Sequence, residues 1–235
     1  MLFRSTKPFL NIGCGTTHLP SAVPPGHELV NPAIYQYDKW VNVDKVEGVG
    51  ADKTFDLFRY PWPLEDDSYD GALLGHIAEH IPHQISGYAP HDIYSREKAE
   101  QQVSRMHELS KLQDGWYAFF AELYRVLTPG AIVHILSPFG RSDSGINDPT
   151  HTRYLTPASF THAMSASENG RGTFKYETGC NFEMIFAQYR PTPHFQTLRE
   201  VMPAKISDQM IIDCFSNAIY DFYVQLRCVK DNAPG

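Results

Sequence analysis

The chain has 235 residues, of which 42% are hydrophobic and 13% aromatic, so it can bury one substantial core and we expect a single α/β domain spanning residues 1–235. Its net charge of −7, with scattered Lys and Arg, disfavours a non-specific grip on nucleic-acid phosphates. The chain shows no apolar stretch of signal-peptide or membrane-spanning length and its four cysteines show no paired spacing, so we expect a reduced, cytoplasmic protein without a membrane partner.

The first predicted strand, residues 8–12, is a short apolar run that leads directly into Gly13 and Gly15. A second predicted strand, residues 40–43, leads into Asp44. In an open α/β sheet, ligands bind at the carboxyl ends of the strands, where glycines let the backbone approach closely and an acid can accept hydrogen bonds from ribose hydroxyls. The two segments together predict a nucleoside site.

The glycine pattern disfavours a pyrophosphate ligand. A dinucleotide fingerprint needs a third glycine three residues after Gly15, where His18 stands, and an acid about 20 residues further on, earlier than Asp44. The sequence also lacks the G-x-x-x-x-G-K-[ST] pattern that cradles nucleotide triphosphates. Between these strands, a proline-rich insertion at residues 16–39 predicts an irregular loop that ends in a short helix near 33–37. This loop is either a lid over the ligand or a surface insertion.

Three further predicted strands follow, within residues 51–58, 69–74 and 131–136. Between the last two, a helical insertion at about residues 84–114 precedes a crossover helix, with a hinge at Asp114-Gly115 and with the apolar stripes of both helices in the core. The remaining predictions are a helix from Pro157 to about 165, strands at 182–189 and 218–229 that pair antiparallel, and helical structure within 203–217. Trp62 is expected in the core.

Five segments of the chain, in this order, resemble class I S-adenosylmethionine-dependent methyltransferases of the type 11 group. The resemblance covers most of residues 8–137. It implies an α/β fold, a Rossmann-like three-layer sandwich with a mostly parallel seven-stranded sheet closed by an antiparallel C-terminal hairpin. It also implies methyl transfer from S-adenosylmethionine to a small polar acceptor. The segments are L-N-I-G-C-G (10–15), V-N-V-D (41–44), D-L-F-R-Y-P-W-P-L-E-D-D-S-Y-D (56–70), G-H-I-A-E-H-I (75–81) and F-F-A-E-L-Y-R-V-L-T-P-G-A-I-V-H-I (119–135).

The resemblance also implies a set of cofactor-binding residues. Asp44 would bind the ribose hydroxyls, with Lys45 beside it, and His76 would lie near the sulfonium. Asp56 and Leu57 would flank the adenine. Many relatives carry an acid at the position of Asn11, so its contact with the cofactor amino group is expected to be weaker or mediated by water. The residues expected around the methionine part are Asn11, Gly13, Cys14 and Gly15.

A histidine-rich segment follows the fourth predicted strand and offers catalytic groups. His76, with an imidazole near the sulfonium, is a candidate catalytic residue, and Glu79 and His80 are either part of the site or a helix cap that supports it. The spacing His-x-x-Glu-His also matches the inverted zinc-protease motif, which makes a metal-dependent hydrolase using His76 and His80 the alternative. Because the motif follows a strand instead of lying within a helix, we assign no metal ligand.

A second polar segment, N-D-P-T-H-T-R-Y, follows the fifth predicted strand. Many type 11 relatives carry a similar D-P-T-H-x-R segment, which the resemblance places over the acceptor. His151 is the first candidate for general base, Arg153 could bind an anionic acceptor with two hydrogen bonds, and Asp148 and Tyr154 complete the predicted acceptor site. The alternative is a structural turn. His134, inside the fifth strand, is expected to be a satisfied core residue.

The acceptor class is narrowed by motifs that the sequence lacks. Amino-group DNA methyltransferases need a D/N-P-P-Y/F loop after the fourth strand, where this chain has G-H-I-A-E-H. Cytosine-carbon enzymes need a nucleophilic cysteine beside a proline in that loop, and the segment contains none. We therefore expect a small-molecule acceptor, a metabolite or sugar-like molecule methylated on oxygen or nitrogen. A non-catalytic subunit that binds S-adenosylmethionine is the remaining alternative.

Overall fold

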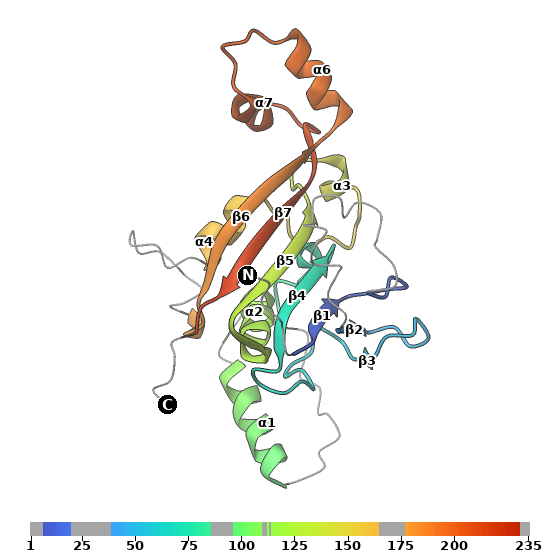
Figure 1. The fold of residues 1–235 in the computed structure, drawn as a ribbon, viewed down its shortest axis with the longest axis vertical. Coiled ribbons are helices and arrows are strands. Elements are labelled where there is room, and N and C mark those ends of the chain that lie inside the picture. Colours follow the sequence, from blue (N-terminus) through green and yellow to red (C-terminus); the bar gives the residue numbers. More distant parts are fainter. Residues whose placement is uncertain are drawn as a thin grey trace.

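The described part of the chain forms a seven-stranded sheet in the computed structural model (Figure 1). The strands are β1 (Phe9–Ile12), β2 (Trp40–Asp44), β3 (Lys53–Thr54), β4 (Tyr69–Gly75), β5 (Leu127–Pro138), β6 (Phe182–Pro191) and β7 (Ile219–Cys228). The structure describes residues 7–19, 39–85, 96–109, 112, 114–164 and 177–230.

The strand order is β3-β2-β1-β4-β5-β7-β6, so the direction in which the chain crosses the sheet reverses between β1 and β4. Strands β1 to β5 pair parallel to their neighbours, whereas β7 runs antiparallel to both β5 and β6. The predicted mostly parallel seven-stranded sheet with an antiparallel C-terminal hairpin is confirmed. In this topology the carboxyl ends of β1, β2 and β4 lie side by side, at the point where open α/β sheets bind ligands.

Aromatic side chains pack helix α2 (Gly115–Val126) and helix α4 (Pro157–Met164) onto one face of the sheet. Asp114 caps α2 by accepting a hydrogen bond from the backbone nitrogen of Trp116 at 2.7 Å. The rings of Phe119 and Phe120 are fully buried, and Phe120 contacts Phe160 of α4 edge to face. Truncating such a ring to alanine costs roughly 3–5 kcal/mol, so these contacts anchor the crossover helix and with it the start of β5.

A second, smaller apolar cluster covers the opposite face of the sheet. Leu19, from the loop after β1, packs there with residues of five strands. Two buried asparagines hold that loop in place: Asn11 donates to the Thr17 carbonyl at 2.9 Å, and Asn42 exchanges hydrogen bonds with the backbone of Leu19. The strand residues of this cluster are Phe9, Trp40, Leu73, Leu136 and Tyr223.

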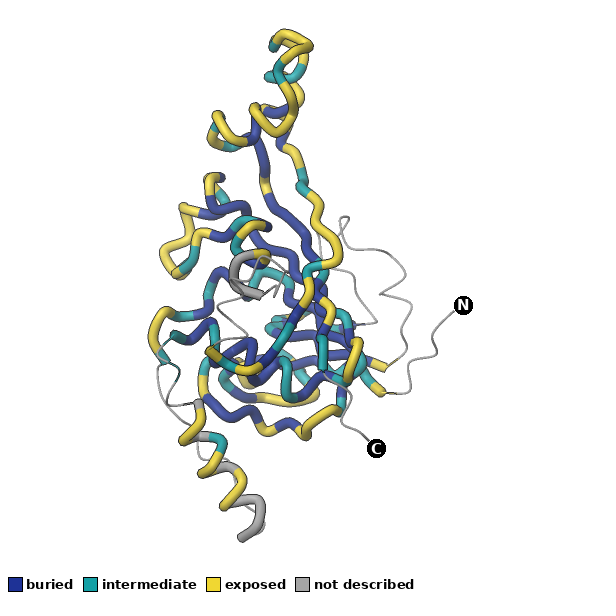
Figure 2. Tube along the Cα trace, turned by 90° about the vertical axis from the view of Figure 1, so that its left-hand side faces the viewer, coloured by how far each residue is buried: buried dark blue, intermediate teal, exposed yellow. Residues whose placement is uncertain are grey.

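Helix α1 (Arg96–Leu109) departs from the sequence prediction. The predicted hinge at Asp114-Gly115 agrees with the end of α1 and the start of α2. The prediction that the apolar stripe of α1 lies in the core is wrong at Val103, which is 63% exposed. Figures 1 and 2 show why: α1 extends away from the sheet instead of covering it. Arg105 connects it to α2 through a 3.0 Å ion pair with the buried Glu122.

Two helices interrupt the C-terminal hairpin beyond the end of the sheet. Helix α7 (Asp208–Cys214) accounts for the helical structure predicted within 203–217, whereas helix α6 (Pro193–Val201) was not predicted. Its start carries a recognisable signal, because Thr192 caps the helix and Pro193 occupies its first position. Both helices are largely exposed (Figure 2).

The short elements near the ligand-binding edge are a 3-10 turn, η3 (Ala78–His80), and helix α3 (Asp143–Ile146). The third predicted strand is reduced to two residues, while Trp62 is buried as predicted. Most of the proline-rich insertion, with its predicted helix near 33–37, lies outside the described residues, as does the end of the helix predicted to reach 165. Among the described helices, none is long and apolar enough to cross a membrane.

Candidate active site

A pocket of about 420 Å³ lies at the carboxyl ends of β1, β2 and β4. Gly13 follows β1 directly, Asp44 ends β2, and His76 follows β4, so the parallel register of the three strands brings these residues to one edge. The sequence missed three lining residues, Phe58, Ile77 and Thr150, and His80, for which it had left open a place in the site or a supporting role, also lines the pocket. The predicted cofactor-binding residues that line the pocket are Gly13, Asp44, Lys45, Asp56, Leu57 and His76.

Gly13 allows the chain to turn sharply at the pocket. Its φ of +69° lies in the left-handed region that favours glycine, and its backbone nitrogen donates to the Val43 carbonyl at 2.9 Å. A Cβ atom at this position would overlap the side chain of Ile77, which lines the same pocket. Glycine therefore serves both the backbone conformation and the close packing of the pocket wall.

Asp44 presents a carboxylate to the pocket that is only partly used by the protein. One oxygen accepts a hydrogen bond from the backbone nitrogen of Gly15 at 2.8 Å, and the other accepts from the nitrogen of Val46 at 2.9 Å. A carboxylate offers about four acceptor positions, so roughly two remain for a ligand. The two backbone bonds fix the orientation of the group, which suits it to bind adjacent hydroxyls.

The other predicted residues of the glycine turn, Asn11, Cys14 and Gly15, do not line the pocket. The side-chain amide nitrogen of Asn11 donates hydrogen bonds to the Thr17 carbonyl and to Asn42 Oδ1, behind the turn. Burial, followed by the charge of Asp44, raises the pKa of the Cys14 thiol to about 11, so the thiol stays protonated. These residues support the turn instead of facing the pocket.

A tight turn after β3 forms another wall. Asp56 accepts a hydrogen bond from the backbone nitrogen of Phe58 at 3.0 Å, which closes the turn. The buried indole of Trp62 donates to the carbonyl of Leu57 at 3.0 Å and ties the turn to the core. The wall therefore combines a carboxylate, at Asp56, with the apolar side chains of Leu57 and Phe58.

His76 lies between the pocket and a buried acid. Its φ of +57° is unusual for a residue with a side chain, and its Nδ1 is 3.5 Å from Oε1 of Glu79. Burial by itself lowers the pKa of His76, but hydrogen bonding to Glu79 and the charges of Glu79 and Asp221 outweigh it, so the pKa is raised overall. Glu79 is buried, and its Oε2 accepts a 3.0 Å hydrogen bond from Ser137.

The segment 150–153 runs beside residues 79–83 and brings His151 next to His80. The backbone nitrogens of Thr152 and Arg153 both donate to the Glu79 carbonyl, at 2.9 and 3.1 Å. The rings of His80 and His151 meet edge to face with centroids 4.8 Å apart. His80 lines the pocket, whereas His151, predicted as general base, does not and lies against His80.

The structure does not reproduce the helical geometry of an inverted zinc-protease motif. Ala78–His80 forms a single 3-10 turn, so His76 and His80 do not share a face of an α-helix. The ring of His80 instead contacts that of His151, 71 residues further along the chain. Asp148 lies at the exposed end of the same segment, where hydrogen bonds from Thr150 lower its pKa.

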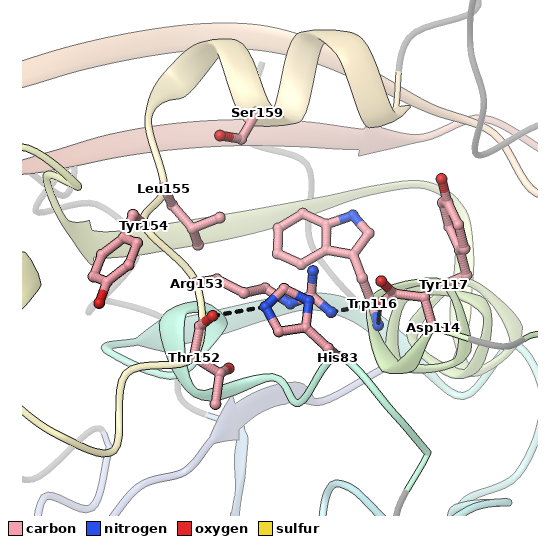
Figure 3. Close-up of a pocket in the computed structure, with 9 residues that line it drawn as sticks. All are labelled: His83, Asp114, Trp116, Tyr117, Thr152, Arg153, Tyr154, Leu155 and Ser159. Atoms are coloured by element: carbon pink, nitrogen blue, oxygen red, sulfur yellow. Dashed lines mark hydrogen bonds and ion pairs between the residues drawn. The ribbon is translucent and has the colours of Figure 1, made fainter.

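Arg153 lies in a different pocket, of about 490 Å³, beyond the paired segments (Figure 3). Figure 3 shows its side chain directed toward Asp114 at the start of α2, beside the ring of Trp116. Its guanidinium also donates to the carbonyls of Ile81 and Pro82, at 2.8 and 2.9 Å. The predicted bidentate grip on an anionic acceptor would have to break these bonds, so the geometry favours a structural role for Arg153.

The structure also shows where Tyr154 and His134, two other residues named in the sequence analysis, lie. Tyr154 lines the pocket of Arg153 and is 62% exposed. His134 is buried on the second face of the sheet and hydrogen-bonds to the Tyr223 hydroxyl at 2.6 Å, as expected of a satisfied core residue. Burial lowers the pKa of His134 to about 4, so its imidazole is neutral at physiological pH.

Comparison with known proteins identifies the fold. No family model matches the chain, and no curated protein matches it by sequence. A crystal structure of a SAM-dependent methyltransferase from Archaeoglobus fulgidus superposes with a TM-score of 0.51 at 16% identity, over 94% of this chain and 86% of that chain. The chain has the fold of class I S-adenosylmethionine-dependent methyltransferases. The YcgJ protein from Bacillus subtilis is also similar, with a TM-score of 0.46 at 13% identity, over 96% of this chain and 93% of that one.

Proposed function

We propose that this chain transfers a methyl group from S-adenosylmethionine to a small polar acceptor. The observation that carries the proposal is the convergence of Gly13, Asp44 and His76 on one pocket, at the strand ends where this fold binds its ligand. The pocket volume of about 420 Å³ lies within the range of small-molecule sites. The sequence resemblance and the fold support the same cofactor independently of this geometry.

The residues of the pocket fit the parts of S-adenosylmethionine. Asp44 has about two free acceptor positions for the ribose hydroxyls, and Lys45 lies beside it. Asp56, Leu57 and Phe58 form a wall that combines an acceptor for an exocyclic amine with apolar surface for a flat base. The turn at Gly13 leaves room for the methionine part, and Asn11, Cys14 and Gly15 hold that turn from behind. When bound, the cofactor supplies a methyl group on a positively charged sulfur.

The acceptor would meet the pocket on the side of His76. Methyl transfer depends mainly on aligning the acceptor atom with the methyl carbon, and a protonated oxygen or nitrogen also needs a base. His76 lines the pocket and is the imidazole we assign to this task. His151, the first candidate from the sequence, is separated from the pocket by His80. The net charge of −7 favours a neutral or cationic acceptor, with hydroxyl or amine groups, over a polyanion.

A turnover assay tests the proposal. The full chain is incubated with S-adenosylmethionine and a panel of sugars, polyols, phenols and amines, and release of S-adenosylhomocysteine is measured. We expect acceptor-dependent release that falls by roughly 10²–10⁴-fold in His76→Ala, the usual contribution of a general base. No binding of S-adenosylmethionine at millimolar concentration would overturn the proposal. Binding without turnover on every acceptor class would favour the non-catalytic subunit instead.

A further inference from the structure

Three side chains with strong metal-binding groups converge next to the pocket: Glu79, His80 and His151. One ligand atom from each lies within 4.8 Å of those of the other two. We propose that these residues form a binding site for a divalent first-row transition ion, best matched by Zn²⁺. This site adjoins the proposed methyl-transfer pocket but is inferred from other observations, and it departs from the sequence analysis, which assigned no metal ligand.

The hydrogen bonds of the two histidines fix which nitrogen is free. Nδ1 of His80 is 3.2 Å from the Thr150 carbonyl, and Nδ1 of His151 is 2.9 Å from the Gly145 carbonyl. A carbonyl oxygen only accepts, so both Nδ1 atoms carry a proton, and in the neutral form of each ring the lone pair lies on Nε2. Metal-binding histidines almost always have this arrangement, with the second ring nitrogen donating to a carbonyl or a carboxylate.

Glu79 supplies an anionic ligand that the protein leaves incompletely satisfied. Only 1% of the residue is exposed, and its Oε2 accepts the hydrogen bond from Ser137 at 3.0 Å. Its Oε1 is buried without a hydrogen bond, and the closest ionic partner of this oxygen is His76 at 3.5 Å. A buried carboxylate oxygen without a hydrogen bond is costly, and a cation beside it would compensate the cost.

Asp148 lies beside the proposed metal site and is a further negative group there. Its Oδ2 lies 3.8 Å from Nε2 of His151, while its other oxygen accepts two hydrogen bonds from Thr150. A carboxylate this close to a proposed ligand atom adds negative charge beside the site, which favours a bound cation.

The ligand set selects the kind of ion. Two imidazole nitrogens and one carboxylate, without a thiolate, match catalytic zinc sites with open positions and also the facial triad of non-haem iron. Zn–N and Zn–O bonds of about 2.1 Å place tetrahedral ligands roughly 3.4 Å apart, so ligand atoms that lie within 4.8 Å of one another would close by up to about 1.4 Å around the ion. Because His80 lines the pocket, the open positions of the ion would be next to it.

The alternative is a purely hydrogen-bonded arrangement that supports the 79–83 and 150–153 segments. That arrangement explains the Nδ1 contacts, but it gives no reason for the three ligand atoms to converge and leaves Oε1 of Glu79 without a hydrogen bond. The two accounts differ in what the purified chain does with metal, and neither depends on an acceptor or on S-adenosylmethionine.

Metal titration of the full chain tests the proposal. The chain is stripped with a chelator and titrated with Zn²⁺ against a chromophoric competitor, and Co²⁺ is used as a visible probe of coordination. We expect one ion per chain, with affinity at least about 100-fold weaker in Glu79→Gln and in His151→Ala. Ser137→Ala, which removes the donor to Glu79, should weaken binding about 10-fold.

His83→Ala is the matched control. It lies in the same histidine-rich segment, but its Nε2 is already bonded to the Thr152 carbonyl at 2.9 Å, so we expect zinc affinity within about twofold of the original chain. Circular dichroism establishes that each variant is folded. Nitrogen-15 spectra of the unaltered chain give a readout without substitution, because zinc should shift the imidazole signals of two histidines and leave that of His83.

Several results would overturn the proposal. These are no uptake of Zn²⁺ or Co²⁺ at micromolar concentration, undiminished uptake in folded Glu79→Gln and His151→Ala, and uptake that His83→Ala abolishes. Zinc-induced shifts confined to other histidines would overturn it as well.

Discussion

Two pockets lie on either side of the paired segments 79–83 and 150–153, and they differ in how their charged groups are used. In the pocket of Arg153, the guanidinium is bonded to Asp114 and to two carbonyls and stacks on Trp116. In the pocket of Gly13, Asp44 retains free acceptor positions. The two pockets are similar in volume, so we base the choice between them on their charged groups: the guanidinium of Arg153 is fully engaged within the protein, whereas the carboxylate of Asp44 is not.

The difference follows from where each group lies along the chain. Asp44 and His76 come at the ends of parallel strands, where the sheet ladder stops and the backbone leaves space. Arg153 lies where an irregular segment must be attached to α2, and its bonds to carbonyls of residues 81 and 82 replace the ladder that such segments lack. The following predictions test this contrast, from the largest expected effect to the smallest.

Arg153→Met should destabilise the fold strongly. It keeps an apolar stem against Trp116 but removes the positive charge that pairs with Asp114 and the donor to the Ile81 and Pro82 carbonyls, so we expect the free energy of unfolding to fall by roughly 3–4 kcal/mol. Urea denaturation measures this loss. Affinity for S-adenosylhomocysteine should stay within about twofold, and a loss of stability below about 1 kcal/mol would contradict the structural role.

His134 lies outside both pockets and is buried and neutral, so it tests how burial of an imidazole affects the stability of the fold. Its pKa is about 4 in the native state against 6.5 as an ordinary value, so between these values the unfolded chain binds a proton that the native chain does not. The contribution of neutral His134 to the free energy of unfolding is complete above pH 6.5. It is lost as the pH falls toward 4, and the loss amounts to about 3 kcal/mol in total. Urea unfolding of the original chain and of His134→Gln at pH 7 and pH 4.5 should show a smaller pH dependence in the variant; equal dependence would refute this assignment.

Asp44→Ala should affect the ligand more than the fold. The substitution removes a charged acceptor from the pocket, so we expect affinity for S-adenosylhomocysteine to weaken by roughly 1–3 kcal/mol, measured by calorimetry. The affinity of Asp44→Asn, which keeps one acceptor oxygen, should lie between those of the original chain and of Asp44→Ala. Unchanged affinity in Asp44→Ala would remove Asp44 from the site.

Tyr154→Ala should have the smallest effect. The residue lines the pocket of Arg153 and is largely exposed, so affinity for S-adenosylhomocysteine should change by less than about twofold and the free energy of unfolding by less than about 0.5 kcal/mol. Calorimetry and urea denaturation measure the two quantities. A tenfold loss of affinity would erase the contrast between the pockets and place the ligand on both sides of the paired segments.

The sequence predicted the features that local pattern determines. The apolar runs that end at Gly13, Asp44 and His76 were recognisable as strands, and parallel pairing alone brings their ends together. The exposure of Val103 could not be predicted, because the 3.6-residue spacing of a helix says nothing about whether a sheet lies within reach. The missed helix α6 carried a readable signal in Thr192 and Pro193.

Contacts between distant segments set the rest of the site. The bond from Arg153 to Asp114 joins residues 39 positions apart, and the contact of His80 with His151 joins two loops whose relative position no local pattern specifies. The sequence named these residues as functional candidates, but which pocket each one faces depends on the pairing of 79–83 with 150–153. The roles of the site residues therefore remain predictions for experiment.

A crystal structure of the chain with S-adenosylhomocysteine tests the central claim most directly. Our account predicts the ribose hydroxyls on Asp44, the base beside Asp56 and Phe58, and the sulfur directed toward His76. The same ligand in the pocket of Arg153 and Trp116, with the Gly13 pocket empty, would contradict it.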